Sequence, residues 1–249
     1  MRKLVAALAC RNKGSRLYGK PLQNLDIEKG ITVLDQIVDC LSSVESIDEI
    51  VLGISEGVEN EDFIDFASRR SLNYIIGDED DVLSRLISCG QSSGATDILR
   101  VTSESPFPYF QLIEESWSEH KDGEFDASFL DDVVDGCGFE LLSMASLEKS
   151  HRDGSERHRS ELCTLFIREN KEDFSISYIQ APDYLRRKDL RLTVDYPEDL
   201  VVCRYIYEAL KDQSPNFNLG DVISFLDSKT KLKELISPFC EEGYSTMYL

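Results

Sequence analysis

Short hydrophobic runs alternate along this chain with segments in which hydrophobic residues recur at the spacing of an α-helix. The runs predict strands at residues 4–10, 49–54, 72–76 and 98–102. The periodic segments predict helices at residues 32–43, 60–70, 80–89 and 110–119. Strands that alternate with helices of about ten residues are typical of βαβ units, so we expect an α/β fold with a mostly parallel sheet.

The pattern changes at residue 124, where glycines punctuate more closely spaced hydrophobic runs. Further strands are predicted at residues 126–130, 139–143, 175–179 and 190–194, with a helical stretch near 161–170. A helix at 197–210 begins with Pro197 and has acidic residues in its first turn, as helix N-termini prefer. Residues 219–249 are predicted to be helical but carry no motif. No repeat or low-complexity linker divides the chain, so residues 1–249 are expected to form a single domain.

Acidic side chains dominate the composition, with 47 Asp and Glu against 27 Lys and Arg and a net charge of −20. A field of this sign repels phosphates, which argues against a nucleic acid or an anionic membrane surface as a partner. No hydrophobic run approaches the roughly 20 residues of a membrane span, and the short hydrophobic start is better explained as a buried strand than as a signal peptide. Seven scattered cysteines without Cys-x-x-Cys spacing indicate reduced thiols and a cytoplasmic protein.

The first 25 residues reverse this charge balance, with six Lys or Arg and no acidic residue. Residues 10–22 directly follow the first predicted strand, and ligands of open parallel sheets bind outside the carboxyl ends of the strands. Gly14 and Gly19 let the backbone approach a ligand, and a turn of amides with Arg and Lys suits a polyphosphate. The order of a Walker loop is missing. By charge alone, a solvated basic loop explains the segment equally well.

Residues 10–22 resemble the opening signature of the cytidylyltransferases, a family that includes CMP-Kdo synthetases, acylneuraminate cytidylyltransferases and the spore-coat polysaccharide group. The matching positions are Arg11, Ser15, Arg16, Gly19, Lys20, Pro21 and Leu22. Three further segments resemble family motifs in the same order, at residues 77–85, 100–107 and 191–200. The resemblance covers roughly residues 1–210, which leaves residues 211–249 as a C-terminal helical tail outside it.

This resemblance implies a Rossmann-like sheet of the nucleotide-diphospho-sugar transferase type. A strand-rich insertion at about residues 124–184 would shape the acceptor site and mediate a homodimer. The implied reaction transfers CMP from CTP to the hydroxyl of a sugar and releases pyrophosphate, in the synthesis of surface-polysaccharide or glycoconjugate precursors. Such a reaction needs positioning and neutralisation of phosphate charge, without a covalent enzyme intermediate.

The matched motifs also imply site residues. Lys20, Arg11 and Arg16 would be catalytic, with Lys20 following the departing pyrophosphate. The residues expected to bind the nucleotide are Arg11, Ser15, Arg16, Lys20, Arg85 and Arg100. Mg²⁺, which accepts one or two carboxylate ligands beside phosphate oxygens, would be held by Glu104 and Asp195, each just after a predicted strand.

Two observations qualify the metal site. The family has Gly-Asp where this chain has Ser103-Glu104, and the extra methylene moves the carboxylate by about 1.5 Å unless the backbone compensates. Asp195 lies two residues before Pro197, a spacing that also suits the N-cap of the following helix.

The acceptor side departs further from the family. Glu140 matches an acceptor-side motif whose usual Asp is missing, and Leu162 stands where a histidine is common. Arg186 to Lys188 and Arg191 form a second basic cluster that could grip a sugar carboxylate, although a solvated loop explains Arg186 and Arg187 equally well. Glu140 and Arg191 are therefore predicted to bind an acceptor that is unusual and acidic. His120 and His151 are expected at the surface.

Two alternatives stay open. The protein could be a nucleotidyltransferase or glycosyltransferase-like enzyme that uses another nucleotide, or a catalytically silent protein that binds sugar nucleotides, which the Ser103-Glu104 pair favours. All versions with a triphosphate site require Lys20 and Asp195 to share one cleft.

Overall fold

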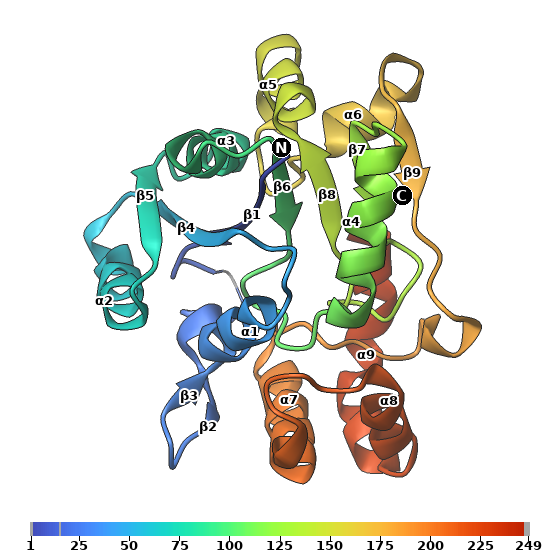
Figure 1. The fold of residues 1–249 in the computed structure, drawn as a ribbon. Helices are drawn as coiled ribbons and strands as arrows, with labels where there is room; N and C mark the ends of the chain where they lie inside the picture. The colour runs from blue at the N-terminus through green and yellow to red at the C-terminus, as the bar shows by residue number, and fades with distance from the viewer. Residues whose placement is uncertain (1, 15, 247–249) are drawn as a thin grey trace.

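The computed structural model describes residues 2–14 and 16–246 of the chain, and Figure 1 shows how their elements are arranged. Within these residues the main strands are β1 (Leu4–Cys10), β4 (Glu49–Ser55), β5 (Asn73–Gly77), β6 (Asp97–Arg100), β7 (Ala127–Phe129), β8 (Glu140–Ser143) and β9 (Ile176–Tyr178). They form one sheet in the order β5-β4-β1-β6-β8-β7-β9. The pairs β5-β4, β4-β1, β1-β6 and β7-β9 are parallel, whereas β8 runs antiparallel to β6 and β7. The predicted α/β fold with a mostly parallel sheet is confirmed.

Helices cover both faces of this sheet. They are α1 (Val33–Ser42), α2 (Glu61–Arg70), α3 (Val82–Ser93), α4 (Ile113–Asp122), α5 (Met144–Asp153), α6 (Leu165–Glu169), α7 (Pro197–Leu210), α8 (Leu219–Asp227) and α9 (Thr230–Thr246). Leu4, Ala6 and Leu8 lie in one buried cluster with residues of α1, α2, α4 and α7 to α9, whereas Val5 and Ala7 lie in a second cluster with α3, α5 and α6. The alternation follows from the period of two along a strand, which makes β1 the centre of a three-layered core.

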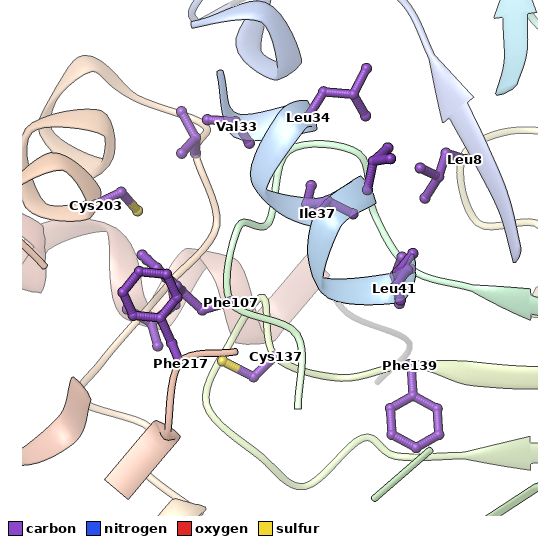
Figure 2. Packing of buried hydrophobic residues seen from close by; sticks show 14 of the residues in the cluster. Leu8, Val33, Leu34, Ile37, Leu41, Phe107, Cys137, Phe139, Cys203 and Phe217 are labelled. Carbon is purple, nitrogen blue, oxygen red and sulfur yellow. The ribbon is translucent and has the colours of Figure 1, made fainter. Parts of the chain in front are cut away.

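The larger cluster ties the C-terminal region to the loop that follows β6. Phe107 and Phe217 meet edge to face, with ring centroids 5.0 Å apart and ring planes at 75° (Figure 2). Phe217 lies just before α8, and Phe107 follows the loop that carries Ser103 and Glu104. The described part of the tail, which no motif covers, therefore contributes to the core through Phe217 and through residues of α8 and α9.

The prediction of a strand at residues 190–194 is wrong. This segment makes a single β-bridge, between Arg191 and Asp135. Two of its amides bond to the main chain of distant loops instead: Leu192 donates to the carbonyl of Asp135 at 2.7 Å, and Val194 to the carbonyl of Glu104 at 3.0 Å. The hydrophobic run is buried as a strand would be, but no strand runs beside it, so it remains an extended linker.

The region from 124 to 184 extends the main sheet. Its strands β7, β8 and β9 continue from β6 to one edge, and it also contains α5, which the hydrophobic pattern did not predict. The short hairpin of β2 (Asn24–Asp26) and β3 (Ile31–Thr32) was not predicted either.

His120 was predicted at the surface, but this prediction is wrong: it lies on the inward side of α4 and is fully buried. Its ring nitrogens lie 2.7 Å from Ser128 Oγ and 3.3 Å from Asp97 Oδ1, so both find polar partners in the interior. His151 is partly exposed and pairs with Asp81. All seven cysteines are buried and free, which agrees with the predicted reduced thiols. None of the helices in the described part of the chain has the length and hydropathy to cross a bilayer.

Candidate active site

A cleft with a volume of about 440 Å³ opens at the carboxyl ends of β1 and β6, where the sequence predicted a ligand. The predicted site residues that line it are Arg11, Arg16, Lys20, Arg85, Arg100, Glu104, Glu140 and Asp195. Ser15 lies outside the described residues. The site therefore gathers side chains from five separate segments of the chain, with basic groups of the first loop facing acidic groups from the later ones.

Lys20 and Asp195 meet in this cleft although they are 175 residues apart in the sequence. Lys20 Nζ donates to Asp195 Oδ1 at 2.6 Å, Arg191 Nη2 to Asp195 Oδ2 at 2.8 Å, and Arg16 Nη1 lies 3.8 Å from Oδ2. Burial disfavours the charged form of Asp195, but these three cations outweigh it and hold the pKa of Asp195 below its usual range. The shared cleft for Lys20 and Asp195 that every triphosphate hypothesis required is present.

The first loop presents Lys20 through a left-handed turn. Gly19 has φ of +60° and precedes η1 (Lys20–Leu22), a conformation that favours glycine. Its amide donates to the carbonyl of Asn12 at 2.8 Å, which closes the loop, and the Asn12 amide in turn donates to Asn60 Oδ1 at 2.8 Å. Because Asn12 and Asn60 are buried, this bond anchors the loop that carries Lys20 to the start of α2.

Glu104 lies beside Asp195. The amide of Val194 donates to the carbonyl of Glu104, and Ser103 Oγ donates both to the carbonyl of Ala9 at 2.7 Å and to Glu104 Oε2 at 3.2 Å. Burial raises the pKa of Glu104, Lys20 partly offsets this, and repulsion from Asp195 adds to the rise. Two carboxylates that repel each other in a cleft fit a divalent cation.

The two carboxylates alone do not make a complete metal site. No group of three or more His, Cys, Asp or Glu side chains within residues 2–14 and 16–246 is arranged to hold a metal ion. Mg²⁺ is usually bound by one or two carboxylates together with water and substrate phosphates, so Glu104 and Asp195 would suffice once a triphosphate is present.

Asp195 does not cap the following helix. The amides of Asp195 and Tyr196 both donate to Asp199 Oδ2, at 3.0 and 2.9 Å. Asp199 thus accepts the hydrogen bonds at the N-terminus of α7, and the Asp195 carboxylate binds the cations of the cleft instead. The alternative of a helix cap at Asp195 is contradicted.

Arg191 lies behind Asp195 and outside the lining of the cleft. It is buried, and beside its bond to Asp195 its Nε lies 3.0 Å from Asp199 Oδ1. The neighbouring Arg187 pairs with Asp189 and Asp227, and Arg186 lies 3.4 Å from Asp132. The second basic cluster of the sequence is thus divided among internal ion pairs, and Arg191 orients Asp195.

Arg85 lines the cleft, but its guanidinium hydrogen-bonds to the main chain of β1 and β4. Its Nη1 donates to the carbonyls of Cys10 and Gly53, each at 3.2 Å, and burial lowers its pKa. A Cβ at Gly77 would lie 2.8 Å from Arg85 Cγ, so glycine at this position leaves room for the arginine stem. The close packing of Arg85 against Gly77 therefore explains why the segment 77–85 has glycine at its first position and arginine at its last.

Glu140 is the centre of a buried ion network on the other side of the cleft. It accepts from Arg100 at 2.7 Å, from Arg168 at 2.9 Å and from Thr164 Oγ1 at 2.9 Å. Burial opposes the charge, but the two arginines hold the pKa of Glu140 below its usual range. The sequence analysis missed Arg168, which also makes a bidentate pair with Asp131 at 2.6 and 2.9 Å. Arg168 lies one helical turn after Thr164 and donates to its hydroxyl, and this spacing in the sequence could have indicated that the two residues share a site.

Asp135 is a further carboxylate of the cleft that no motif singled out. It is 4% exposed, its Oδ2 has no hydrogen-bond partner, and Arg191 Nη1 lies 4.0 Å away. Burial raises the pKa of Asp135 to about 6, Arg191 opposes the rise, and Asp195, Asp199 and Glu104 contribute to it. The Asp135 carboxylate is thus surrounded by other carboxylates, and Arg191 offsets their repulsion only in part.

The Asp135→Asn variant tests this charge. The folded state binds the proton more tightly than the unfolded state, whose Asp titrates near 4, so Asp135 makes the protein less stable as pH rises from 4 to 6. We expect the unfolding free energy of the wild type, relative to the variant, to fall by about 2–3 kcal/mol between pH 4 and pH 7. Urea unfolding at four pH values measures it, and a constant difference would contradict the assignment.

No protein-family model matches the chain. An uncharacterized protein of Methanocaldococcus jannaschii is 24% identical over 242 residues, which is 97% of this chain and 98% of that protein. The spore coat polysaccharide biosynthesis protein SpsF of Bacillus subtilis is 22% identical over 230 residues, which is 91% of this chain and 95% of that protein.

Solved structures share the fold. A cytidylyltransferase from Leptospira borgpetersenii superposes with a TM-score of 0.83 at 17% identity, over 93% of this chain and 97% of that one. CMP:2-keto-3-deoxy-manno-octonic acid synthetase, complexed with CTP, superposes with a TM-score of 0.62 at 14% identity, over 83% of this chain and 99% of that one. The resemblance carried by the sequence motifs is therefore confirmed, and this chain has the fold of the cytidylyltransferases over nearly its whole length.

Proposed function

We propose that the protein is a sugar cytidylyltransferase, which transfers CMP from CTP to a sugar hydroxyl and releases pyrophosphate. The observation that carries this proposal is the meeting of Lys20, Glu104 and Asp195 in one cleft beneath the basic first loop. A solved protein of the same fold is described as complexed with CTP, which supports CTP as the nucleotide.

The reaction follows from the side chains present. The oxygen of the acceptor hydroxyl attacks the α-phosphorus of CTP and gives up its proton to solvent water. The bond from that phosphorus to the oxygen bridging the β-phosphate breaks, and pyrophosphate leaves with the bonding electrons. Arg11, Arg16 and Lys20 bind the phosphates, and Lys20 neutralises the charge that grows on the leaving group. When bound by Glu104 and Asp195, Mg²⁺ would supply further neutralisation of the phosphate oxygens. Arg191 holds Asp195 in position for this role.

The acceptor in this proposal is an acidic sugar, for which Arg100 in the lining of the cleft supplies positive charge, whereas Arg168 lies outside that lining. Both arginines already pair with Glu140, and this observation favours an uncharged sugar as the second candidate. We further propose a single cytoplasmic domain that acts as a homodimer through residues 124–184, in the synthesis of precursors of surface polysaccharides or glycoconjugates.

Pyrophosphate release tests the function. The protein is incubated with Mg²⁺, each of the four nucleoside triphosphates and a panel of acidic and neutral sugars. Release that depends on CTP and on one sugar class supports the proposal and identifies the acceptor class. Preference for UTP or ATP would point to another nucleotidyltransferase, and nucleotide binding without turnover for any sugar would point to a silent binding protein.

Glu104→Asp tests whether the longer carboxylate suits this site. The main-chain bond between Val194 and Glu104 fixes the backbone, so aspartate withdraws the carboxylate by about 1.5 Å from its place beside Asp195. We expect turnover to fall about tenfold and the magnesium concentration for half-maximal rate to rise. Faster turnover in the variant would show instead that glutamate weakens the natural enzyme.

A further inference from the structure

The C-terminal helix α9 lies outside every motif of the sequence, yet it contacts the residues that hold the predicted metal ligand. Ile236 and Cys240 are buried in the core and anchor the helix. Ser237 Oγ donates to the carbonyl of Glu234, the group that Pro238 cannot serve because it has no N–H. The half-buried side chain of Phe239 then turns towards the start of α7.

Two contacts connect Phe239 with the cleft. Its ring stacks on the ring of Tyr196, with centroids 4.0 Å apart and planes at 17°. Its carbonyl accepts from Arg191 Nη1 at 2.8 Å, while Nη2 of the same guanidinium binds Asp195. Phe239 thus contacts Arg191 through its main chain and Tyr196 through its side chain. Arg191 binds the Asp195 carboxylate, and Tyr196 follows Asp195 in the sequence.

Tyr196 passes the contact on to the first loop. The guanidinium carbon of Arg16 lies 4.9 Å from the centroid of the Tyr196 ring, within the range of a cation–π interaction. Arg16 comes from the loop that begins at the end of β1, and its Nη1 also lies 3.8 Å from Asp195. Phe239, Tyr196 and Arg16 therefore form a continuous series of contacts from the tail to the basic loop.

We propose that α9 is part of the active site and that Phe239 is a positioning residue, whose ring fixes Tyr196 and through it the guanidinium of Arg16 for binding the phosphates. The inference rests on the proposed function for the role of Arg16. A flexible arginine loses side-chain entropy when it binds a phosphate, and an aromatic surface that holds its guanidinium beforehand reduces that loss.

Three variants distinguish the effect of the aromatic ring of Phe239 from the effect of its volume and from a general effect of changing α9. Phe239→Leu keeps an apolar side chain but removes the stacking, Phe239→Tyr keeps the ring, and Leu235→Ala changes an exposed residue of the same helix. Each is measured for binding of inorganic pyrophosphate with Mg²⁺ by calorimetry, for kcat and KM with CTP, and for thermal unfolding.

We expect Phe239→Leu to weaken pyrophosphate binding and to raise the KM for CTP, each about tenfold, with a smaller change in kcat. Phe239→Tyr and Leu235→Ala should stay within twofold of the wild type. In an Arg16→Ala background, Phe239→Leu should have no further effect on binding, because both changes remove the same interaction. If Phe239→Leu does not fold, Tyr196→Leu removes the other ring and should give the same loss.

Wild-type affinity in Phe239→Leu, an equal loss in Phe239→Tyr, or a full additional loss in the Arg16→Ala background would each overturn the inference. The pyrophosphate measurement keeps the two proposals separate. A wild type that binds pyrophosphate but releases none from CTP contradicts the proposed function, and the binding series still decides the role of Phe239.

Discussion

Replacing Lys20 by alanine is expected to lower turnover by at least tenfold and to leave the fold intact. The Lys20 ammonium lies 2.6 Å from Asp195 Oδ1 and is the basic group with which the first loop ends. In the reaction it neutralises the leaving pyrophosphate, and removal of such a group commonly costs ten- to thousandfold in rate. Stability should change little, because Asp195 keeps its bond to Arg191. Pyrophosphate release measures turnover, and thermal unfolding measures stability.

Lys29→Ala is the matched control. It removes the same charge from an exposed side chain in the turn between β2 and β3, 4.0 Å from Asp26 and outside the cleft lining. Turnover equal to that of the wild type is expected. Unchanged kinetics in Lys20→Ala, or an equal loss in both variants, would refute the assignment of Lys20 to the phosphates.

Asp195→Asn is expected to have the largest effect, a loss of turnover of at least a hundredfold that excess magnesium does not restore. The amide keeps the shape of the side chain but removes the charge that binds Lys20, Arg16 and Arg191 and that would hold the metal. An uncharged oxygen is a poor ligand for a hard cation, and the freed cations no longer share a fixed partner. Rates measured over a range of magnesium concentrations test both consequences.

Asp227→Asn provides the comparison. Asp227 pairs with Arg187 and Lys233 on the outside of the tail, so the same substitution breaks a cluster of similar charge away from the cleft. Turnover is expected to stay near that of the wild type. Substantial activity in Asp195→Asn would mean that the metal, or the reaction, does not use this carboxylate.

The hydrophobic pattern was sufficient for most of the sheet and helices. The strand at Leu4–Cys10 and the helix at Pro197–Leu210 have the predicted bounds, because a period of two or 3.6 is a local property of the chain. The pattern failed at residues 190–194 and at His120, where the outcome depends on neighbours distant in the sequence. An extended run becomes a strand only where another strand runs beside it. A polar ring such as that of His120 is buried only where hydrogen-bond partners are present in the interior.

The resemblance to the cytidylyltransferases predicted that Lys20, Glu104 and Asp195 share one site, but it could not assign the partners of each group. The sequence left Asp195 open between a metal ligand and a helix cap, and the bonds to Asp199 decided against the cap. Arg191 was predicted to touch the acceptor, and the structure places it behind Asp195. Such assignments depend on differences of a few ångströms between side chains that no motif spacing encodes.

The amino-acid sequence alone determined that this protein is an acidic α/β chain with a basic loop after its first strand. Those properties are local or compositional, and they survive without knowledge of the fold. Only the tertiary structure decided that Glu140 is enclosed by Arg100 and Arg168, that Asp135 lies in the cleft, and that Phe239 of the tail reaches Tyr196. The reason is that burial and pairing of charges arise from segments that meet only after the chain has folded.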